Sequence, residues 1–279
     1  MSKDLTSLEG KLVFVTGAGV GIGKGVGLEL ARRGADVVLQ YASSAEGAME
    51  AVEEITGMGR RATAIQGDLS QVSECRRVVD EAARFLGGLD ALVCNAGVTM
   101  IVDFLDVTEE QFSRIYNINI RGQYFCAQQA VPHIVKRGEA FKQQHPDETW
   151  RGGSIVNMSS VQAFGGVPGH TVYAGTKGAI ISFSQALMVD LLPHRIRVNV
   201  VAPGAIEVPR YWNIIPNYSR EVGSRMSPWG RVGFPEDVGY TVAFLVSDAA
   251  EFINGQVIRV DGGSTARLNT GTSYESTEG

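Results

Sequence analysis

Short apolar runs alternate with helical segments along the first third of this chain, and this alternation most restricts its fold. Expected strands lie at residues 11–16, 35–41, 61–66 and 89–94, and expected helices lie between them, two of them at residues 45–57 and 71–86. Because the connections are short and the helices intervene, the pattern predicts a parallel sheet with helices on both faces. Ligands of such sheets bind at the carboxyl ends of the strands, so the residues that follow each run are candidate binding residues.

The same alternation continues to the end of the chain. Further strands are expected at residues 154–159, 195–201 and 256–260, and further helices at residues 107–130, 172–191 and 235–247. We therefore predict a single α/β domain over residues 1–279, a Rossmann-type doubly wound parallel sheet of about seven strands. Polar residues 138–152 predict a surface loop, and the proline-punctuated, aromatic-rich segment 205–230 predicts a lid. The polar tail 264–279 is expected to be partly disordered or to lie across a neighbouring subunit.

Composition excludes several classes of protein. The 279 residues include 44% hydrophobic and 20% charged residues, as in ordinary globular proteins, and the net charge of −5 offers no basic surface for nucleic acid and disfavours an acidic carrier protein. No apolar run reaches the ~18 residues of a membrane span, and the N-terminus lacks an apolar signal core, so we expect a cytoplasmic protein without membrane contact. Cys75, Cys94 and Cys126 and the four histidines lack ligand spacing, so no metal site or disulfide is expected.

A glycine-rich turn follows the first expected strand. Residues 16–25 read TGAGVGIGKG, with glycines spaced G-x-x-x-G-x-G before a helical segment. Such glycines let the backbone approach a pyrophosphate closely and leave N–H groups at a helix N-terminus pointing at the anion. The turn predicts a dinucleotide site, although by itself it could also be a plain strand-to-helix corner.

The second candidate site combines a serine, a tyrosine and a lysine. Tyr173 and Lys177 are four residues apart on the expected helix 172–191, so they lie on one face, and Ser160 follows the preceding strand. A neighbouring cation favours the phenolate of tyrosine, whose ordinary pKa is ~10. The three side chains together predict a proton donor and acceptor that works near neutral pH. A purely structural Tyr-Lys pair is the alternative, and the glycine-rich turn argues against it.

With these motifs present, residues 8–263 resemble the short-chain dehydrogenase/reductase family, in a subgroup similar to bacterial aldose (glucose/rhamnose-type) 1-dehydrogenases and 3-oxoacyl-acyl-carrier-protein reductases. The resemblance implies NAD(P)-dependent hydride transfer between a nicotinamide and a secondary alcohol or carbonyl. It implies the catalytic residues Asn119, Ser160, Tyr173 and Lys177. Tyr173 would be the general acid in reduction and base in oxidation, Lys177 would favour its phenolate and bind the cofactor ribose, Ser160 would bind the substrate oxygen, and Asn119 would position a water.

The resemblance also implies the cofactor-binding residues Thr16, Gly17, Gly21, Ile22, Gly23, Asp68, Leu69, Asn95, Ala96, Gly97, Tyr173, Lys177, Pro203, Gly204 and Ile206. Tyr41 ends the second strand where NAD-dependent members commonly carry Asp, and the hydroxyls of Ser43 and Ser44 could receive a phosphate. Lys24 is the only nearby cation. We expect NADP to be favoured, with dual use of NAD. Val208 replaces the usual threonine, which places one nicotinamide hydrogen bond in doubt.

Substrate recognition is expected from the segment 205–230 and the serine-tyrosine region. The candidate substrate residues are Ser160, Gln162, His170, Glu207, Arg210 and Trp212. Aromatic faces beside carboxylate and guanidinium groups suit a sugar or polyol, so the first hypothesis is oxidation of an aldose to a lactone. The second is reduction of a 3-oxoacyl thioester or another carbonyl compound. The third is a dinucleotide-binding regulator without turnover. The family resemblance further implies a homotetramer formed through helices 107–130 and 172–191.

Overall fold

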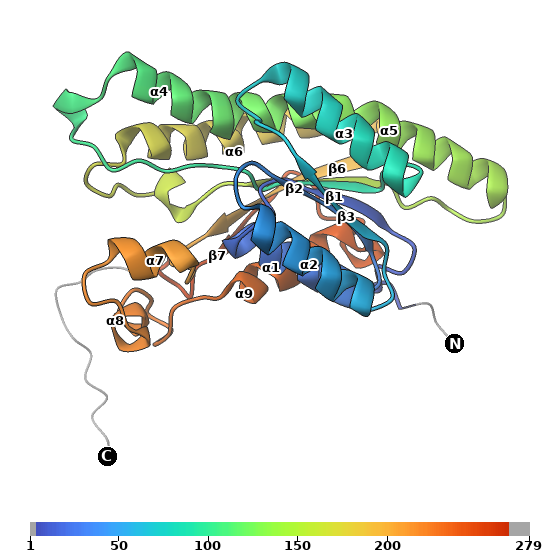
Figure 1. Cartoon of the computed structure of the whole chain (residues 1–279). Coiled ribbons are helices and arrows are strands. Elements are labelled where there is room, and N and C mark those ends of the chain that lie inside the picture. Colours follow the sequence, from blue (N-terminus) through green and yellow to red (C-terminus); the bar gives the residue numbers. More distant parts are fainter. Residues whose placement is uncertain (1–3, 268–279) are drawn as a thin grey trace.

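A seven-stranded parallel sheet forms the centre of the computed structural model, which describes residues 4–267 (Figure 1). The strands are β1 (Leu12–Val15), β2 (Asp36–Tyr41), β3 (Ala62–Gln66), β4 (Ala91–Cys94), β5 (Gly153–Met158), β6 (Ile196–Pro203) and β7 (Val257–Val260). Their order is β3-β2-β1-β4-β5-β6-β7, and every neighbouring pair is parallel. The predicted fold class is confirmed.

Helices cover both faces of the sheet (Figure 1). One layer contains α3 (Val72–Leu86), α4 (Glu109–Tyr116), α5 (Gln123–Gln144) and α6 (Thr171–Leu191), and the other contains α1 (Gly21–Arg32), α2 (Ala45–Gly57) and α9 (Pro235–Val246). None of the helices that the structure describes is long and apolar enough to span a lipid bilayer.

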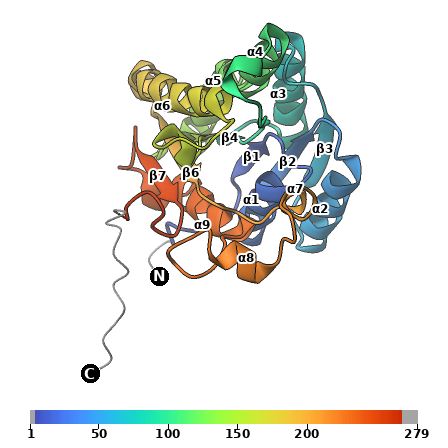
Figure 2. The same cartoon turned by 90° about the vertical axis from the view of Figure 1, so that its left-hand side faces the viewer.

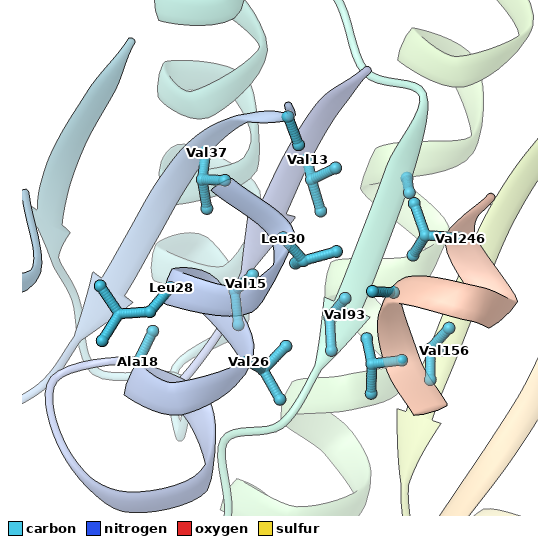
Figure 3. Close-up of a cluster of buried hydrophobic side chains, with 14 of the residues drawn as sticks. Val13, Val15, Ala18, Val26, Leu28, Leu30, Val37, Val93, Val156 and Val246 are labelled. Atoms are coloured by element: carbon cyan, nitrogen blue, oxygen red, sulfur yellow. The ribbon is translucent and has the colours of Figure 1, made fainter. Parts of the chain in front are cut away.

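Two apolar clusters hold these layers to the sheet, because the central strands are buried on both faces. In β1, Val13 and Val15 pack with Val26 and Leu30 of α1 (Figure 3), whereas Leu12 and Phe14 belong to the cluster on the opposite face. This is the continuous apolar pattern that a doubly covered parallel strand requires. The packed clusters fix the strand ends, where the candidate site residues lie.

The strand order reverses between β1 and β4, and the crevice outside the carboxyl ends of strands at such a point is the usual ligand site of this architecture. The short helices α7 (Pro209–Ile214) and α8 (Arg220–Ser224) lie at this end of the molecule (Figure 2). They belong to the segment 205–230, which the sequence correctly predicted not to form one regular element. The structure describes the predicted tail 264–279 only as far as residue 267, and the remaining residues lie outside the described part. Within it, Thr265 donates to Asp261 Oδ2 through its backbone N–H (2.9 Å) and through its hydroxyl (2.6 Å).

Two predictions about the region after β4 were wrong. The helix expected at 107–130 is interrupted by a π-helical turn (Asn117–Gly122), and α5 then runs to Gln144. The first half of the expected surface loop 138–152 is therefore helical. Its residues, GEAFKQQ, are mostly good helix formers, and Trp150 from the second half is only 7% exposed and packs against Gly138. The many polar residues of 138–152 gave no indication of this packing.

Candidate active site

A cavity of about 930 Å³ lies at the carboxyl ends of the strands, and segments distant in sequence meet around it. The glycine-rich turn, the ends of β2 and β4 and the segment after β6 line one part of it. Ser160, Tyr173, Lys177 and the start of α7 line another part, together with residues 98–101 after β4 and residues of α4. The structure thus brings the two candidate sites of the sequence into one cavity.

The glycine-rich turn has no room for side chains. Gly17 and Gly21 have φ values of +64° and +60°, a backbone conformation that favours glycine. A Cβ atom at Gly23 would lie 2.2 Å from the Gly17 carbonyl oxygen. No side chain caps the start of α1, and Gly21 and Ile22 line the cavity, so N–H groups of the first turn remain for a ligand. A bare, positively polarised helix start beside glycines fits a dinucleotide pyrophosphate.

Thr16 and Asn95 hold this turn in place from beneath. The Thr16 hydroxyl oxygen accepts hydrogen bonds from the backbone N–H groups of Asn95 and Ala96, each at 3.0 Å. The Asn95 amide nitrogen donates to the carbonyl oxygens of Gly17 (2.9 Å) and Thr16 (3.1 Å). Thr16 and Gly23 were predicted to bind the cofactor, but they do not line the cavity. They instead shape the turn.

Gln40 joins this network and was missed from the sequence. Its side-chain oxygen accepts from the Gly17 N–H (2.9 Å), and its nitrogen donates to the Gly67 carbonyl oxygen (2.8 Å). The side chain is buried on β2 and also lines the cavity. A polar glutamine within the apolar strand DVVLQY was the available signal, because a buried amide requires hydrogen-bond partners.

The end of β2 presents hydroxyl groups to the cavity. Tyr41, Ser43 and Ser44 line it, as do Asp68 and Leu69 after β3. Residues 41–44 carry no carboxylate that would bind a ribose diol or repel a phosphate. Lys24, the cation noted in the sequence, forms an ion pair with Glu50 at 2.7 Å.

Ser160, Tyr173 and Lys177 lie close together in the same cavity. The Lys177 ammonium nitrogen lies 5.4 Å from the centre of the Tyr173 ring and donates to the Met158 carbonyl oxygen at 2.9 Å. The Ser160 hydroxyl oxygen accepts from the Gln162 N–H at 3.2 Å. Because the oxygen accepts in that bond, the serine hydroxyl proton can itself be donated, and here it is donated to Tyr173.

Burial dominates the electrostatics of this group. It raises the pKa of Tyr173, an effect partly offset by the hydrogen bond from Ser160. It also lowers the pKa of Lys177 to about 8. The sequence analysis expected the ammonium to favour the phenolate, whereas in the protein without cofactor burial acts in the opposite direction and raises the pKa of the phenol. Tyr173 is therefore protonated at neutral pH.

Asn119 is fully buried in the π-helical turn. Its amide oxygen accepts from the Val98 N–H (2.8 Å), and its nitrogen donates to the Val98 carbonyl oxygen (2.9 Å) and the Thr176 hydroxyl (3.1 Å). It thereby ties the segment after β4 to α6, one residue before Lys177. Its expected role of positioning a water stays a prediction.

The candidate substrate residues divide into two sets. Gln162, His170 and Arg210 line the cavity, as does Tyr211, which the sequence analysis did not select. Glu207 and Trp212 do not line it. The Glu207 carboxylate accepts from the Tyr218 hydroxyl at 2.8 Å, and Trp212 packs edge-on against the Tyr218 ring, with 4.9 Å between centres.

The parallel sheet, the dinucleotide cradle and the buried serine, tyrosine and lysine define a nicotinamide-dependent oxidoreductase. A protein-family model described as enoyl-(acyl carrier protein) reductase matches residues 17–265. The chain belongs to the short-chain dehydrogenase/reductase family. The regulator hypothesis has no support from this membership.

Several relatives match over nearly their whole length. The chain is 42% identical to a hydroxynaphthalene reductase-like protein Arp2 of Metarhizium robertsii, covering 92% of this chain and 96% of the relative. It is 39% identical to versicolorin reductase stcU of Emericella nidulans, covering 94% and 98%. A short-chain dehydrogenase from Burkholderia cenocepacia, solved in complex with NADP, is 34% identical with a TM-score of 0.81, covering 92% and 98%. These relatives do not single out the aldose dehydrogenase subgroup.

Proposed function

We propose that this protein uses NADPH to reduce a ketone on a hydroxylated, fused aromatic ring system. The observation that carries the proposal is the character of the cavity around Ser160 and Tyr173. Apart from the glycine-rich turn, the cavity is lined by the apolar or aromatic side chains of Val98, Met100, Ile101, Tyr211 and Ile214. A flat aromatic substrate can bury its faces against such walls while its carbonyl meets the hydroxyl groups.

The names of the relatives support the same substrate class. Both sequence relatives are named as reductases, and one name specifies hydroxynaphthalene. Their identities of 42% and 39% are measured over matches that cover 92% and 94% of this chain. The proposal corresponds to the carbonyl-reductase alternative raised by the sequence.

Aldose oxidation, our first hypothesis, is less well supported. It relied on Glu207 and Trp212 to contact sugar hydroxyls and sugar C–H groups. The Glu207 side chain is 11% exposed and hydrogen-bonded to Tyr218, and neither Glu207 nor Trp212 lines the cavity. A sugar would thus lose the carboxylate and indole that suited it.

The protein's own groups can complete the reduction. When bound, the reduced nicotinamide supplies the hydride. Ser160 donates its hydroxyl proton in a hydrogen bond to the carbonyl oxygen, in place of the bond that it makes to Tyr173 here, and that oxygen takes the proton of Tyr173 as the carbonyl carbon becomes a secondary alcohol. The raised pKa of Tyr173 keeps this proton in place at neutral pH. The Lys177 ammonium, whose pKa is lowered to about 8, stabilises the phenolate that results, and solvent restores the proton.

The proposed preference for NADPH rests on the end of β2. Tyr41, Ser43 and Ser44 line the cavity with hydroxyls and no carboxylate, and the Burkholderia relative was solved with NADP. We expect kcat/KM to be higher with NADPH than with NADH, while NADH still supports turnover. A clear preference for NADH would contradict this assignment.

Reduced-nicotinamide absorbance tests the function. Purified protein is mixed with NADPH or NADH and a panel of tetralones and oxoacyl thioesters, and separately with NADP or NAD and a panel of aldoses. The proposal predicts rapid NADPH oxidation with hydroxylated tetralones. Activity confined to aldoses or to thioesters would refute it.

We also propose a homotetramer. Large apolar side chains are exposed on the outer helices, including Phe112 of α4 (45% exposed), Tyr124 of α5 (44%) and Val189 of α6 (57%). Such exposure on one helical layer is typical of a protein interface. Sedimentation velocity should give a particle of four chains, and a monomer at micromolar concentration would contradict this.

A further inference from the structure

Two buried side-chain oxygens, on residues that line the cavity, have no hydrogen-bond partner within the described part of the chain. The Thr99 hydroxyl oxygen and the Gln162 amide oxygen are both buried, and no group among residues 4–267 bonds to either. Both residues line the cavity. Other buried unpaired side-chain atoms of the described chain belong to residues that do not line it: Arg121, Gln123, Asn157 and Arg197. Because a buried unpaired polar atom costs stability, two such atoms in one cavity point to a ligand.

The backbone on either side of these atoms is firmly held. Asn119 binds both the N–H (2.8 Å) and the carbonyl oxygen (2.9 Å) of Val98, the residue before Thr99. The Gln162 N–H is bonded to the Ser160 hydroxyl oxygen at 3.2 Å. The two unpaired atoms are therefore presented by segments anchored on proposed catalytic residues, which favours a role in substrate recognition.

Both atoms belong to the substrate side of the cavity. The nucleotide side is formed by the glycine-rich turn and the end of β2, whereas Thr99 lies beyond Gly97, where a Cβ atom would be 3.5 Å from the Lys177 ammonium nitrogen. The segment that carries Thr99 is joined to the loop before α6 by a bond from the Val102 N–H to the Gly169 carbonyl oxygen (3.0 Å). This loop leads directly to Tyr173.

We infer that Thr99 and Gln162 form a subsite for a phenolic hydroxyl of the substrate, distinct from the carbonyl that is reduced. The inference rests on the proposed function and narrows it. An amide oxygen only accepts hydrogen bonds, so its ligand must bring a donor, and a threonine hydroxyl can donate to the same ligand atom. A phenolic hydroxyl offers both functions, because it donates its proton and its oxygen accepts. An unsubstituted aromatic ketone leaves both protein atoms unpaired.

The test compares α-tetralone with tetralones that carry a phenolic hydroxyl at each ring position, using the holoenzyme. The readout is the ratio of kcat/KM for the hydroxylated ketone to that for α-tetralone, which cancels losses common to both. The wild-type protein should favour the best hydroxylated ketone by about tenfold or more. Thr99→Val and Gln162→Met should each lower this ratio by about three- to tenfold, and Thr99→Ser, which keeps the hydroxyl, should preserve it. Gln143→Met, on the exposed end of α5, is the matched control.

Failure of the subsite and failure of the proposed function give different results. Turnover of tetralones with a ratio near one, or with a ratio that Thr99→Val and Gln162→Met leave unchanged, overturns the subsite alone. If Thr99→Val and Gln162→Met weaken NADPH binding in the absence of substrate by the same factor, the two atoms bind the cofactor, and the subsite is also overturned. Absence of tetralone turnover refutes the proposed function. In that case the ratio of the dissociation constants of α-tetralone and the hydroxylated ketone is measured by ligand-observed NMR with NADP present. A ratio near one, or one that Thr99→Val and Gln162→Met leave unchanged, overturns the subsite.

Discussion

The buried ammonium of Lys177 makes the stability of the folded protein depend on pH. Burial lowers the pKa of Lys177 from its ordinary 10.5 to about 8. The unfolded chain regains the ordinary pKa, so between these two values the unfolded state binds more protons than the folded state. Stability must then rise as the pH increases through this range, and the Lys177 contribution is lowest below pH 8.

The size of this effect follows from the two pKa values. A separation of about 2.5 pH units corresponds to about 3 kcal/mol at about 1.4 kcal/mol per unit. Integration of the proton binding places about 1 kcal/mol of this change between pH 7 and pH 9.

Urea denaturation of the apoprotein and of Lys177→Met at pH 7, 8 and 9 measures the effect. Methionine has a similar length and no charge, so the other titrating groups cancel in the difference between the two proteins. The wild-type protein should gain about 1 kcal/mol relative to the variant from pH 7 to pH 9. A difference that stays constant over this range would refute the claim that Lys177 is desolvated.

Three further substitutions test other parts of the account. Tyr173→Phe removes the proposed proton donor, so turnover should fall by at least about a hundredfold while NADPH fluorescence titration still shows binding; near wild-type turnover would contradict the mechanism. Gly23→Ala places a Cβ 2.2 Å from the Gly17 oxygen, so calorimetry should show at least about tenfold weaker cofactor binding, and unchanged affinity would count against the cradle. Tyr218→Phe removes the bond to Glu207, which should destabilise the 205–230 segment by about 1 kcal/mol and speed its tryptic cleavage; an unchanged cleavage rate would speak against this contact.

The sequence predicted the fold well because its signals are local. Each apolar run and each helical period is contained in a few neighbouring residues, and parallel strands bring their carboxyl ends to one edge. Residues after β1, β4 and β5 were therefore expected together, and the cavity collects them. The spacing of Tyr173 and Lys177 needed only helix geometry.

What the sequence missed depends on contacts between distant segments. Glu207 was expected to face a sugar, but its carboxylate is hydrogen-bonded to Tyr218 of the same 205–230 segment. Gln40 was overlooked because its partners, Gly17 and Gly67, come from other strand ends. Trp150 was assigned to a loop, although tertiary packing buries it.

Deuterium transfer tests the central claim most directly. The protein is incubated with NADPH that carries deuterium at nicotinamide C4 and with a hydroxylated tetralone, and the product is analysed by mass spectrometry and NMR. The account predicts a secondary alcohol with one deuterium on the former carbonyl carbon, formed by the wild-type protein and lost in Tyr173→Phe. Unreacted ketone, in a preparation that instead reduces NADP in the presence of an aldose, would contradict it.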